Sequence, residues 1–390
     1  MIYSQLPEWN ITHKKIFLRA DLNVPLNQSI ISNDFRLTSI LPTLNYLLEK
    51  NNMVILATHI GDPKTNDQSL STKLLIPWFK QKGYSITFAP DILCAATHPV
   101  KPNHIVLLEN LRFFPGEKNG DPFFAKELAN TADYYVNDAF GTIHRNDCSI
   151  TLLPYEFTEN KRTIGFLIEK ELCTLDTLTH NPQKPFVTLL GGKKIEDKIP
   201  LIQGLLKTVD TILLCPALCF SFLKACGKTV GKSLINNELL SLCTDIMHKA
   251  EDNNKKIVLP LDYLVADKTV DGKLSYVDAN NFPLDGIGIT IGPKTVQLFK
   301  KEIDTSHTFF VNCAMGFNEK PETLISSTQL FSDISYTNKV SIAAGGDTIE
   351  RLSDAHVLSQ FTHVSTGGGA ALSYLSGKQL PGLNPFTEEH

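Results

Sequence analysis

Short apolar runs alternate with longer amphipathic stretches along the whole chain. Aliphatic and β-branched residues dominate the runs, which is typical of strands buried on both faces of a parallel sheet. Stretches such as 38–50 and 121–131 separate the runs and have the spacing of amphipathic helices. The predicted strands are 14–21, 52–59, 104–110, 133–139, 185–192, 211–216, 256–265, 307–312, 339–344 and 361–366. The pattern predicts an α/β protein in which helices cover parallel sheets.

The two halves of the chain meet in a predicted helix at 164–180. Leu167, Ile168, Leu172 and Leu175 recur there at helical spacing, and two prolines in 181–185 end the helix. A chain of 390 residues is long enough for two domains of ordinary size. We therefore expect two doubly wound parallel-sheet domains, 1–168 and 169–372, joined by a helical hinge. Residues 373–390 form a proline-rich tail that we expect to pack back on one domain, with the N-terminal domain as our choice.

Composition narrows the classes of function. Hydrophobic residues make up 42% and charged residues 20% of the chain, as in globular proteins. The formal charge of −4 argues against a dedicated nucleic-acid binder, and no apolar run approaches the about 18–20 residues of a membrane span. The eight cysteines form no CxxC pair, and the first residues contain no apolar core of a signal peptide. These features favour a cytoplasmic protein.

Polar residues and glycines repeatedly follow the predicted strands. They are Arg19, Asp21, His59, Arg112, Asp138, Gly191, Gly345 and Gly367. Ligands of doubly wound sheets bind beyond the carboxyl ends of the strands. The repetition in both halves predicts a cleft between two domains.

Each polar motif of the first half has an ordinary structural explanation when taken alone. Asp21 and Asn23 suit a turn after a strand, single arginines are usually solvated, and a single histidine is usually a hydrogen-bonded core residue. The joint pattern is more specific. RADLNVP, THIGDP, LLENLRFFPGE and NDAFGTIHR occur in this order and resemble four motifs of the phosphoglycerate kinase family. The resemblance extends from about Lys15 to about Gly382.

The resemblance implies a basic site for 3-phosphoglycerate in the first half. Its contacts would be Asp21, Asn23, Arg36, His59, Arg112 and Arg145. Guanidinium groups suit a phosphate and a carboxylate because they are planar and permanently charged. Arg36 is the residue that we place at the reacting carboxyl, where it would stabilise charge during transfer.

One residue of this half departs from the family pattern. Asp62 stands where the family's histidine motif has an arginine, so an anion replaces a phosphate-binding cation. We expect weaker substrate binding unless Asp62 points away or Lys64 compensates. A plain turn residue before Pro63 is the other explanation of Asp62.

The second half has three glycine-rich turns that precede predicted helices. Gly191 and Gly192 precede Lys194 and Lys198, which we expect on one helix face and which resemble the family's GG-x-K-x-x-x-K motif. Glycine lets backbone N–H groups approach an anion, and the start of a helix favours negative charge. The other two turns contain Gly345, Gly346, Asp347 and Thr348, and Gly367, Gly368 and Gly369.

The resemblance assigns roles to these turns. Lys194 would contact the transferring phosphoryl group, and Lys198 the nucleotide phosphates. Asp347 would bind Mg²⁺ on the nucleotide and Thr348 would donate to phosphate, since Mg²⁺ takes oxygen ligands and keeps several waters. Gly367–Gly369 would stabilise the transferring group. Gly231, Asn312 and Glu319 are further nucleotide contacts that the resemblance implies.

Several glycines of the family pattern are missing around the expected nucleoside pocket. The chain has 215–219 as Cys-Pro-Ala-Leu-Cys and 311–316 as Val-Asn-Cys-Ala-Met-Gly. Thr290, Asn318 and Ala344 also differ from the usual residues, and Lys193 adds a charge. The changes lie where backbone or ligand would come close.

The resemblance implies a monomeric, Mg²⁺-dependent phosphoglycerate kinase that acts on 3-phosphoglycerate and ATP or ADP, with no nucleic acid or membrane partner. A divergent relative that binds metabolites with weak or no kinase activity is the alternative, supported by Asp62 and the altered turns. A nicotinamide-dependent dehydrogenase is disfavoured because no G-x-G-x-x-G follows an early strand.

Overall fold

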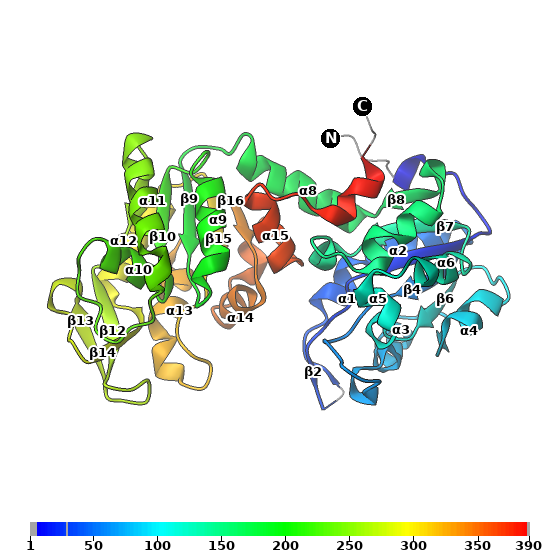
Figure 1. The fold of residues 1–390 in the computed structure, drawn as a ribbon, viewed down its shortest axis with the longest axis horizontal. Coiled ribbons are helices and arrows are strands. Elements are labelled where there is room, and N and C mark those ends of the chain that lie inside the picture. The colour runs from blue at the N-terminus through cyan, green and yellow to red at the C-terminus, as the bar shows by residue number, and fades with distance from the viewer. Residues whose placement is uncertain (1–5, 29, 388–390) are drawn as a thin grey trace. The chain divides into compact units, whose positions relative to one another are not determined.

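The chain folds into two compact units in the computed structural model, which describes residues 6–28 and 30–387. Unit 1 contains the described residues up to 173 together with 379–387, and unit 2 contains 174–378. In Figure 1, unit 1 runs from blue to teal with the red C-terminal segment, and unit 2 runs from green to orange-red. No helix in the described part of the chain combines the length and apolarity of a membrane span.

Unit 1 is built on a six-stranded sheet in the order β5-β6-β4-β1-β7-β8, with every neighbouring pair parallel. Its strands are β1 (Lys15–Ala20), β4 (Met53–Ala57), β5 (Ile86–Ala89), β6 (His104–Leu108), β7 (Tyr134–Asp138) and β8 (Arg162–Ile164). A two-stranded hairpin, β2 (Leu26–Asn27) and β3 (Ile30–Ile31), follows β1. The first strand, β1, lies between β4 and β7, so the chain builds the sheet outward in both directions from it.

Unit 2 repeats this plan with the order β11-β10-β9-β15-β16-β17, again with parallel neighbours. Its strands are β9 (Phe186–Leu190), β10 (Thr211–Leu214), β11 (Lys256–Val258), β15 (Thr308–Asn312), β16 (Val340–Ala343) and β17 (His363–Val364). The first strand is again central, between β10 and β15. The predicted α/β class with two doubly wound parallel sheets is confirmed.

The helices are mostly short. Unit 1 contains α1 (Phe35–Ser39), α2 (Leu41–Glu49), α3 (Ile76–Gln81), α4 (Ile92–Thr97), α5 (Pro115–Asn119), α6 (Pro122–Ala129) and α7 (Cys148–Thr151). The helix α8 (Phe166–Thr179) runs from unit 1 into unit 2. Unit 2 contains α9 (Ile195–Leu205), α10 (Leu218–Ala225), α11 (Leu240–Asp252), α12 (Pro293–Asp304), α13 (Ile325–Asp333), α14 (Gly346–Asp354) and α15 (Gly368–Leu375).

The predicted strand at 256–265 is wrong in one respect. Its apolar run contains two strands, because β11 ends before Pro260 and β12 (Asp262–Asp267) begins after it. Proline lacks the N–H that a central strand donates. The strand β12 instead joins β13 (Leu274–Asp278) and β14 (Gly286–Ile291) in a small antiparallel sheet. Figure 1 shows this sheet at the end of unit 2 that is far from α14 and α15.

The C-terminal residues contain the short 3-10 helix η12 (Pro381–Phe386) in place of an α-helix. The ring of Phe386 stacks on Tyr135 of β7 at a centroid distance of 6.2 Å. The N–H of Gly382 donates to the Ile143 carbonyl at 3.0 Å. This segment therefore packs on the sheet of unit 1.

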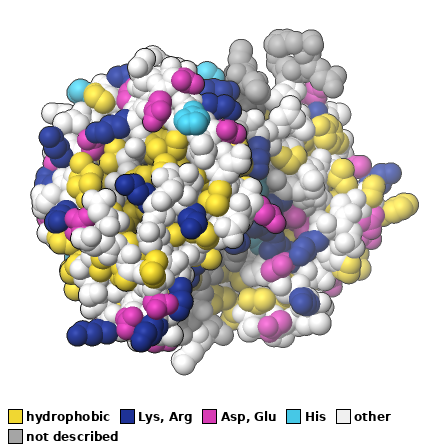
Figure 2. Space-filling view, turned by 60° about the vertical axis from the view of Figure 1, so that its left-hand side comes forward, with side chains coloured by type: hydrophobic (Ala, Val, Ile, Leu, Met, Phe, Trp, Pro, Cys, Tyr) yellow, Lys and Arg dark blue, Asp and Glu magenta, His cyan; other side chains and the backbone are white. Residues whose placement is uncertain are grey.

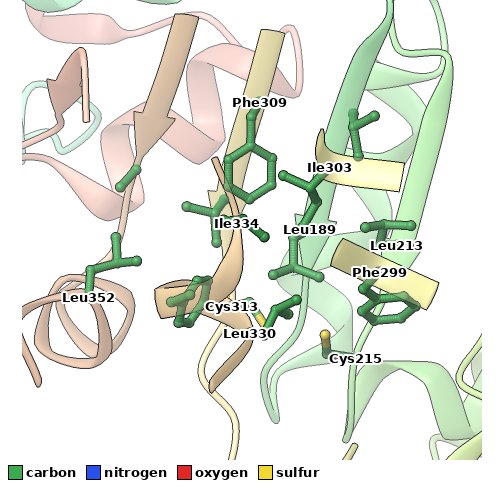
Figure 3. Close-up of a cluster of buried hydrophobic side chains, with 14 of the residues drawn as sticks. Leu189, Leu213, Cys215, Phe299, Ile303, Phe309, Cys313, Leu330, Ile334 and Leu352 are labelled. Atoms are coloured by element: carbon green, nitrogen blue, oxygen red, sulfur yellow. The ribbon is translucent and has the colours of Figure 1, made fainter. Parts of the chain in front are cut away.

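The core of unit 2 extends to the loops at the carboxyl ends of its strands. Cys215 and Cys313 belong to this core together with Leu189, Phe299 and Leu330 (Figure 3). Burial raises the pKa of the Cys215 thiol well above its usual value, with the neighbouring Cys313 as a further cause. Both side chains are buried and act as small apolar groups.

The exposed surface carries charges of both signs. Figure 2 shows basic and acidic side chains interspersed on one face of the molecule, in keeping with a net charge of −4.

Gly191 begins the first loop of unit 2 and lies close against the core. A Cβ there would lie 2.5 Å from the Cys313 sulfur and 2.9 Å from the Cys215 Cβ. We expect Gly191→Ala to lower the free energy of unfolding by about 1–3 kcal/mol through overpacking, measured by urea unfolding with circular dichroism. Gly346→Ala is the control, because a Cβ there meets no atom within 4 Å. Equal stability of the two variants would contradict this explanation of Gly191.

Candidate functional site

A loop cavity of unit 2 lies at the switch point of its sheet. The chain leaves β9 towards β10 on one side and later returns to β15 on the other, and such a reversal creates a crevice at the carboxyl ends. Gly191 follows β9, and its N–H donates to the carbonyl of Asn312, the last residue of β15, at 3.1 Å. The cavity has a volume of about 560 Å³.

Most of the predicted nucleotide residues line this cavity. They are Lys194, Lys198, Asn312, Glu319, Gly345, Gly346, Asp347 and Thr348, together with Lys193. They come from the loops after β9, β15 and β16 and from the helices α9 and α14 that follow two of these loops. The structure therefore brings three separate sequence motifs into one place.

Lys198 is a buried cation at the floor of the cavity. Its ammonium donates to the Asn312 Oδ1, and the Asn312 amide nitrogen donates to the Ala344 carbonyl at 2.6 Å. Burial lowers the pKa of Lys198, while the charges of Cys313, Asp197 and Asp347 act in the opposite direction. Asn312 thus fixes the position of Lys198 in addition to lining the cavity.

Lys194 has a different environment from Lys198. The helix α9 begins at Ile195, so Lys194 is its exposed N-cap residue. The expectation that both lysines lie on one helix face is therefore wrong, although both line the cavity. Lys193 lies over the ring of Phe317 at 5.0 Å and forms part of the wall.

The two other glycine turns of unit 2 lie close together. Gly345 has a φ of 100° and caps α14, and a Cβ at Gly368 would lie 2.8 Å from the Gly345 Cα. The Thr348 hydroxyl accepts from the Cys313 N–H at 3.0 Å. Asp347 is exposed in the first turn of α14. Gly368 therefore packs against the backbone of the turn at Gly345.

A smaller cavity of about 380 Å³ shares Lys193 with the larger one. It is lined by Ala217, Leu218, Ser221, Leu234 and the segment 235–238, together with Ile195 and Glu196. Its lining therefore combines apolar and polar side chains. Ala217 and Leu218 are thus the residues of the altered 215–219 turn that reach a cavity, whereas Cys215 and Cys219 are buried outside both linings.

Gly231 lines neither of these two cavities. Its φ is 56°, and a Cβ there would lie 2.3 Å from the Gly286 carbonyl oxygen. The close approach of two backbone segments explains this glycine. The altered residue Thr290 is also remote from both linings, and its buried hydroxyl makes no hydrogen bond in the described part of the chain.

In unit 1 the predicted substrate residues gather around the Asp21 carboxylate. Arg36 donates to Asp21 Oδ2 at 2.6 Å, and the His59 Nδ1 lies 4.0 Å from Oδ1. The Asn23 side chain accepts from the Gly61 N–H at 2.9 Å. Asp21 and Asn23 therefore hold Arg36 and the loop after β4 in place.

Arg112 lies beside the same loop. It donates to the Gly61 carbonyl at 2.6 Å, and its guanidinium lies 3.6 Å from Asp62 and 3.7 Å from Asp147. Arg145 is exposed, and its charge is one of those that lower the pKa of His59 and of Arg112. Arg112 and Arg145 thus contribute to one basic region with Arg36.

Asp62 departs from the family pattern, and its negative charge is balanced by a cation that the sequence did not indicate. Lys118, in α5, donates to Asp62 Oδ1 at 2.8 Å. This hydrogen bond is the main cause that lowers the pKa of Asp62, and the charges of Lys118 and Arg112 add to it. Lys118, rather than Lys64, is the cation that balances Asp62.

The presence of Arg19 at the end of β1 is explained by its contacts inside unit 1. It is completely buried, donates to Ser149 Oγ at 2.7 Å and lies 3.7 Å from Glu117. Burial raises the pKa of Glu117, and the charge of Arg19 opposes this rise. Asp138 is likewise buried and accepts from the N–H groups of Leu167 and Ile168 at 3.0 and 3.1 Å, at the start of α8. These two strand-end residues anchor elements of unit 1.

The environment of His59 predicts a pH dependence. Burial, followed by the charges of Arg19, Arg112, Arg145 and Arg36, holds the pKa of this imidazole well below its usual value. The unfolded chain takes up a proton near pH 6.5, but the folded protein does not. We therefore expect stability to fall as the pH drops from about 7 to about 5, by up to about 1.4 kcal/mol per pH unit from this group.

Urea unfolding at several pH values tests this expectation. Both tryptophans, Trp9 and Trp78, lie in unit 1, so their fluorescence reports on the unit that contains His59. His59→Gln should flatten the pH dependence, whereas His248→Gln, which removes an exposed histidine of unit 2, should leave it unchanged. An unchanged slope in His59→Gln would contradict the proposed cause.

Comparisons with known proteins agree with this geometry over nearly the whole chain. The family model for phosphoglycerate kinase matches residues 6–378. Phosphoglycerate kinase from Bdellovibrio bacteriovorus is 36% identical over 96% of this chain and 95% of that protein. The cytosolic phosphoglycerate kinase of Triticum aestivum is 38% identical over 98% of each chain.

A solved structure shows the same fold at full length. The structure of phosphoglycerate kinase from Coxiella burnetii has a TM-score of 0.86 and 30% identity, and the match covers 99% of each chain. The chain belongs to the phosphoglycerate kinase family.

Proposed function

We propose that this chain reversibly transfers a phosphoryl group between ATP and 3-phosphoglycerate, forming ADP and 1,3-bisphosphoglycerate. The observation that carries the proposal is the full-length match to phosphoglycerate kinases. Support comes from the geometry, since each unit presents cationic side chains at the carboxyl ends of its parallel strands. Unit 1 would be the 3-phosphoglycerate domain and unit 2 the nucleotide domain.

In unit 1, Arg36, Arg112 and Arg145 bind the anionic groups of the substrate. Asp21 holds Arg36 at 2.6 Å and leaves further donors of the guanidinium fork free for a ligand. His59 is neutral at neutral pH because its pKa is lowered by burial and the arginines, so it serves as a hydrogen-bonding group. Asn23, which is tied to Gly61, positions the loop.

In unit 2, the cationic side chains of Lys194 and Lys198 bind phosphate oxygens, and the N-terminus of α14 favours negative charge. Asn312 holds Lys198, and Glu319 lines the side of the cavity where it accepts from ribose hydroxyls. Gly345 and Gly346 leave the backbone open to the phosphates. Gly367–Gly369, of which Gly368 packs against Gly345, stabilise the transferring group.

Mg²⁺ fits this cavity as a partner of the nucleotide. The described residues contain no group of three or more His, Cys, Asp or Glu that would hold a metal alone. The exposed carboxylate of Asp347 would supply an oxygen ligand to a Mg²⁺ ion that arrives with the nucleotide. When bound, the ion would supply neutralisation of phosphate charge.

The chemistry requires positioning and charge neutralisation rather than a base. A carboxylate oxygen of 3-phosphoglycerate attacks the γ-phosphorus of ATP; a new O–P bond forms, and the bond to the β-phosphate oxygen breaks. The carboxylate is already ionised at neutral pH, so no proton is removed. The two ligands must therefore meet in line, with Arg36 and Lys194 at the reacting groups.

A divergent metabolite-binding protein is the second candidate, and Asp62 is the observation that favours it. Its carboxylate accepts a hydrogen bond from Lys118 and lies 3.6 Å from Arg112 in the basic region. The lysines, Asp347 and Thr348 in unit 2 favour the kinase. We also propose a monomer in the cytosol, the compartment named for the wheat relative.

Lys194→Ala tests the kinase assignment. We expect the kcat for MgATP and 3-phosphoglycerate to fall by at least about 100-fold, because a preorganised cation at the transferring group is lost. Lys194 is exposed, so the unfolding curve should not change. Lys301→Ala, which removes an exposed lysine of α12, is the control. Full turnover in Lys194→Ala would refute the assignment of this lysine.

The ion pairs of Asp62 predict that replacing this residue changes the affinity for 3-phosphoglycerate. We expect Asp62→Asn to lower the KM for 3-phosphoglycerate by about two- to fivefold at low salt, because it releases Lys118 and Arg112. Lys118→Ala should raise this KM. The Asp62→Asn effect should shrink in the Lys118→Ala background and at high salt, while Glu127→Gln, an exposed acid on α6, leaves KM unchanged. A KM that does not respond to Asp62→Asn would show that Asp62 points away from the ligand.

A further inference from the structure

Arg351 is a buried cation in the wall of the larger cavity of unit 2. It lies in the second turn of α14, and its side chain is only 6% exposed. It lines the cavity of about 560 Å³ together with the residues proposed to hold the nucleotide phosphates. None of the sequence motifs described above contains Arg351.

Helix geometry directs Arg351 towards the phosphate end of the cavity. It follows Asp347 by four residues and Thr348 by three, so all three share one face of α14. Side chains of a helix lean towards its N-terminus. Asp347, Thr348 and Arg351 therefore line the cavity from one face of α14, a helix whose start favours an anion.

The partners of Arg351 leave it available to a ligand. Its Nη2 lies 3.3 Å from Glu350 and its Nη1 lies 3.0 Å from Asp354, and both carboxylates are about half exposed. Its buried Nη1 nevertheless makes no hydrogen bond within the described residues. An arginine that served only these surface carboxylates would gain little from burial, because exposed ion pairs contribute little.

The charge of Arg351 complements that of the lysines. Lys193, Lys194 and Lys198 reach the cavity from the loop after β9 and from α9, whereas Arg351 reaches it from α14. Lys198 donates to Asn312, and Lys193 lies over Phe317. A guanidinium stays charged and offers a planar fork that matches phosphate oxygens.

We propose that Arg351 is an additional phosphate-binding residue of the nucleotide site, donating to the phosphate chain of ADP and ATP. The inference rests on the proposed function. The guanidinium pairs with Glu350 and Asp354, and phosphate oxygens compete with these carboxylates for its donors when nucleotide binds. Arg351 therefore sets nucleotide affinity without taking part in the transfer itself.

Calorimetric titration of the full chain with MgADP and with adenosine tests this proposal. We expect Arg351→Ala to weaken MgADP binding by about tenfold or more, the usual effect of losing a hydrogen bond to a charged group. Adenosine affinity should not change, because adenosine has no phosphate. The KM for MgATP should rise by a similar factor with little change in kcat, and Arg351→Lys should recover part of the loss.

Two controls separate binding from structure. Lys301→Ala removes an exposed charge of unit 2 outside the cavity and should bind MgADP as the wild type does. Asp354→Asn removes a carboxylate partner of Arg351 without removing a cavity cation, so it should keep or tighten MgADP binding. A purely structural ion pair predicts the opposite, namely that Asp354→Asn and Arg351→Ala weaken both ligands alike.

The outcomes also separate this inference from the proposed function. Wild-type protein that fails to bind MgADP would overturn the nucleotide site itself. Wild-type protein that binds MgADP, together with an Arg351→Ala variant of equal affinity, would overturn only the role of Arg351. Equal losses for MgADP and adenosine would also overturn it.

Discussion

A single amide, that of Asn312, ties together the loops that follow three neighbouring strands of unit 2. It accepts from Lys198 of α9, which follows β9, and donates to Ala344, which follows β16. The next residue, Cys313, donates its N–H to Thr348 of α14. Because Asn312 ends the strand between β9 and β16, these bonds determine where the glycine turns and the buried lysine lie. The cavity follows from this arrangement.

The same arrangement of loops packs the glycine turns of unit 2 closely against neighbouring side chains. Gly191 has no room for a side chain against Cys215 and Cys313, and Gly345 has none against Asn312. The residues that stand in place of the expected glycines therefore do not all project into a ligand site. Cys215 and Cys219 fill the core, while Ala217 and Leu218 line the smaller cavity.

Unit 1 holds several positive charges close together. Several arginines gather there, and carboxylates such as Asp21 and Asp147 lie beside them. The low pKa of His59 keeps a further positive charge out of the cluster. Fixed cations of this kind bind an anion without reorganising, which is the physical basis of electrostatic preorganisation. The exposed ion pair of Asp62 and Lys118 modifies the electrostatic field of this cluster at its edge.

Sequence patterns predicted most strands of the two sheets, and most of the predicted nucleotide residues line the cavity. Buried strands such as β4 and β15 are continuous apolar runs, and the turns after them carry recognisable residues. The short strands β5 and β8 were missed, since four or three residues give too little periodicity. Lys118 and Arg351 were missed because their roles depend on tertiary neighbours. In sequence each is an ordinary charged helix residue, and only the fold places Lys118 beside Asp62 and Arg351 in the cavity.

The most direct test of the central claim is transfer of label from ATP that carries a radioactive γ-phosphoryl group. Wild-type protein would be incubated with this ATP, Mg²⁺ and 3-phosphoglycerate, and the products would be separated. The account predicts label in an acyl phosphate of 3-phosphoglycerate, with release of an equal amount of ADP. Label that remains in ATP, with protein that still binds 3-phosphoglycerate, would contradict the kinase and favour the metabolite-binding alternative.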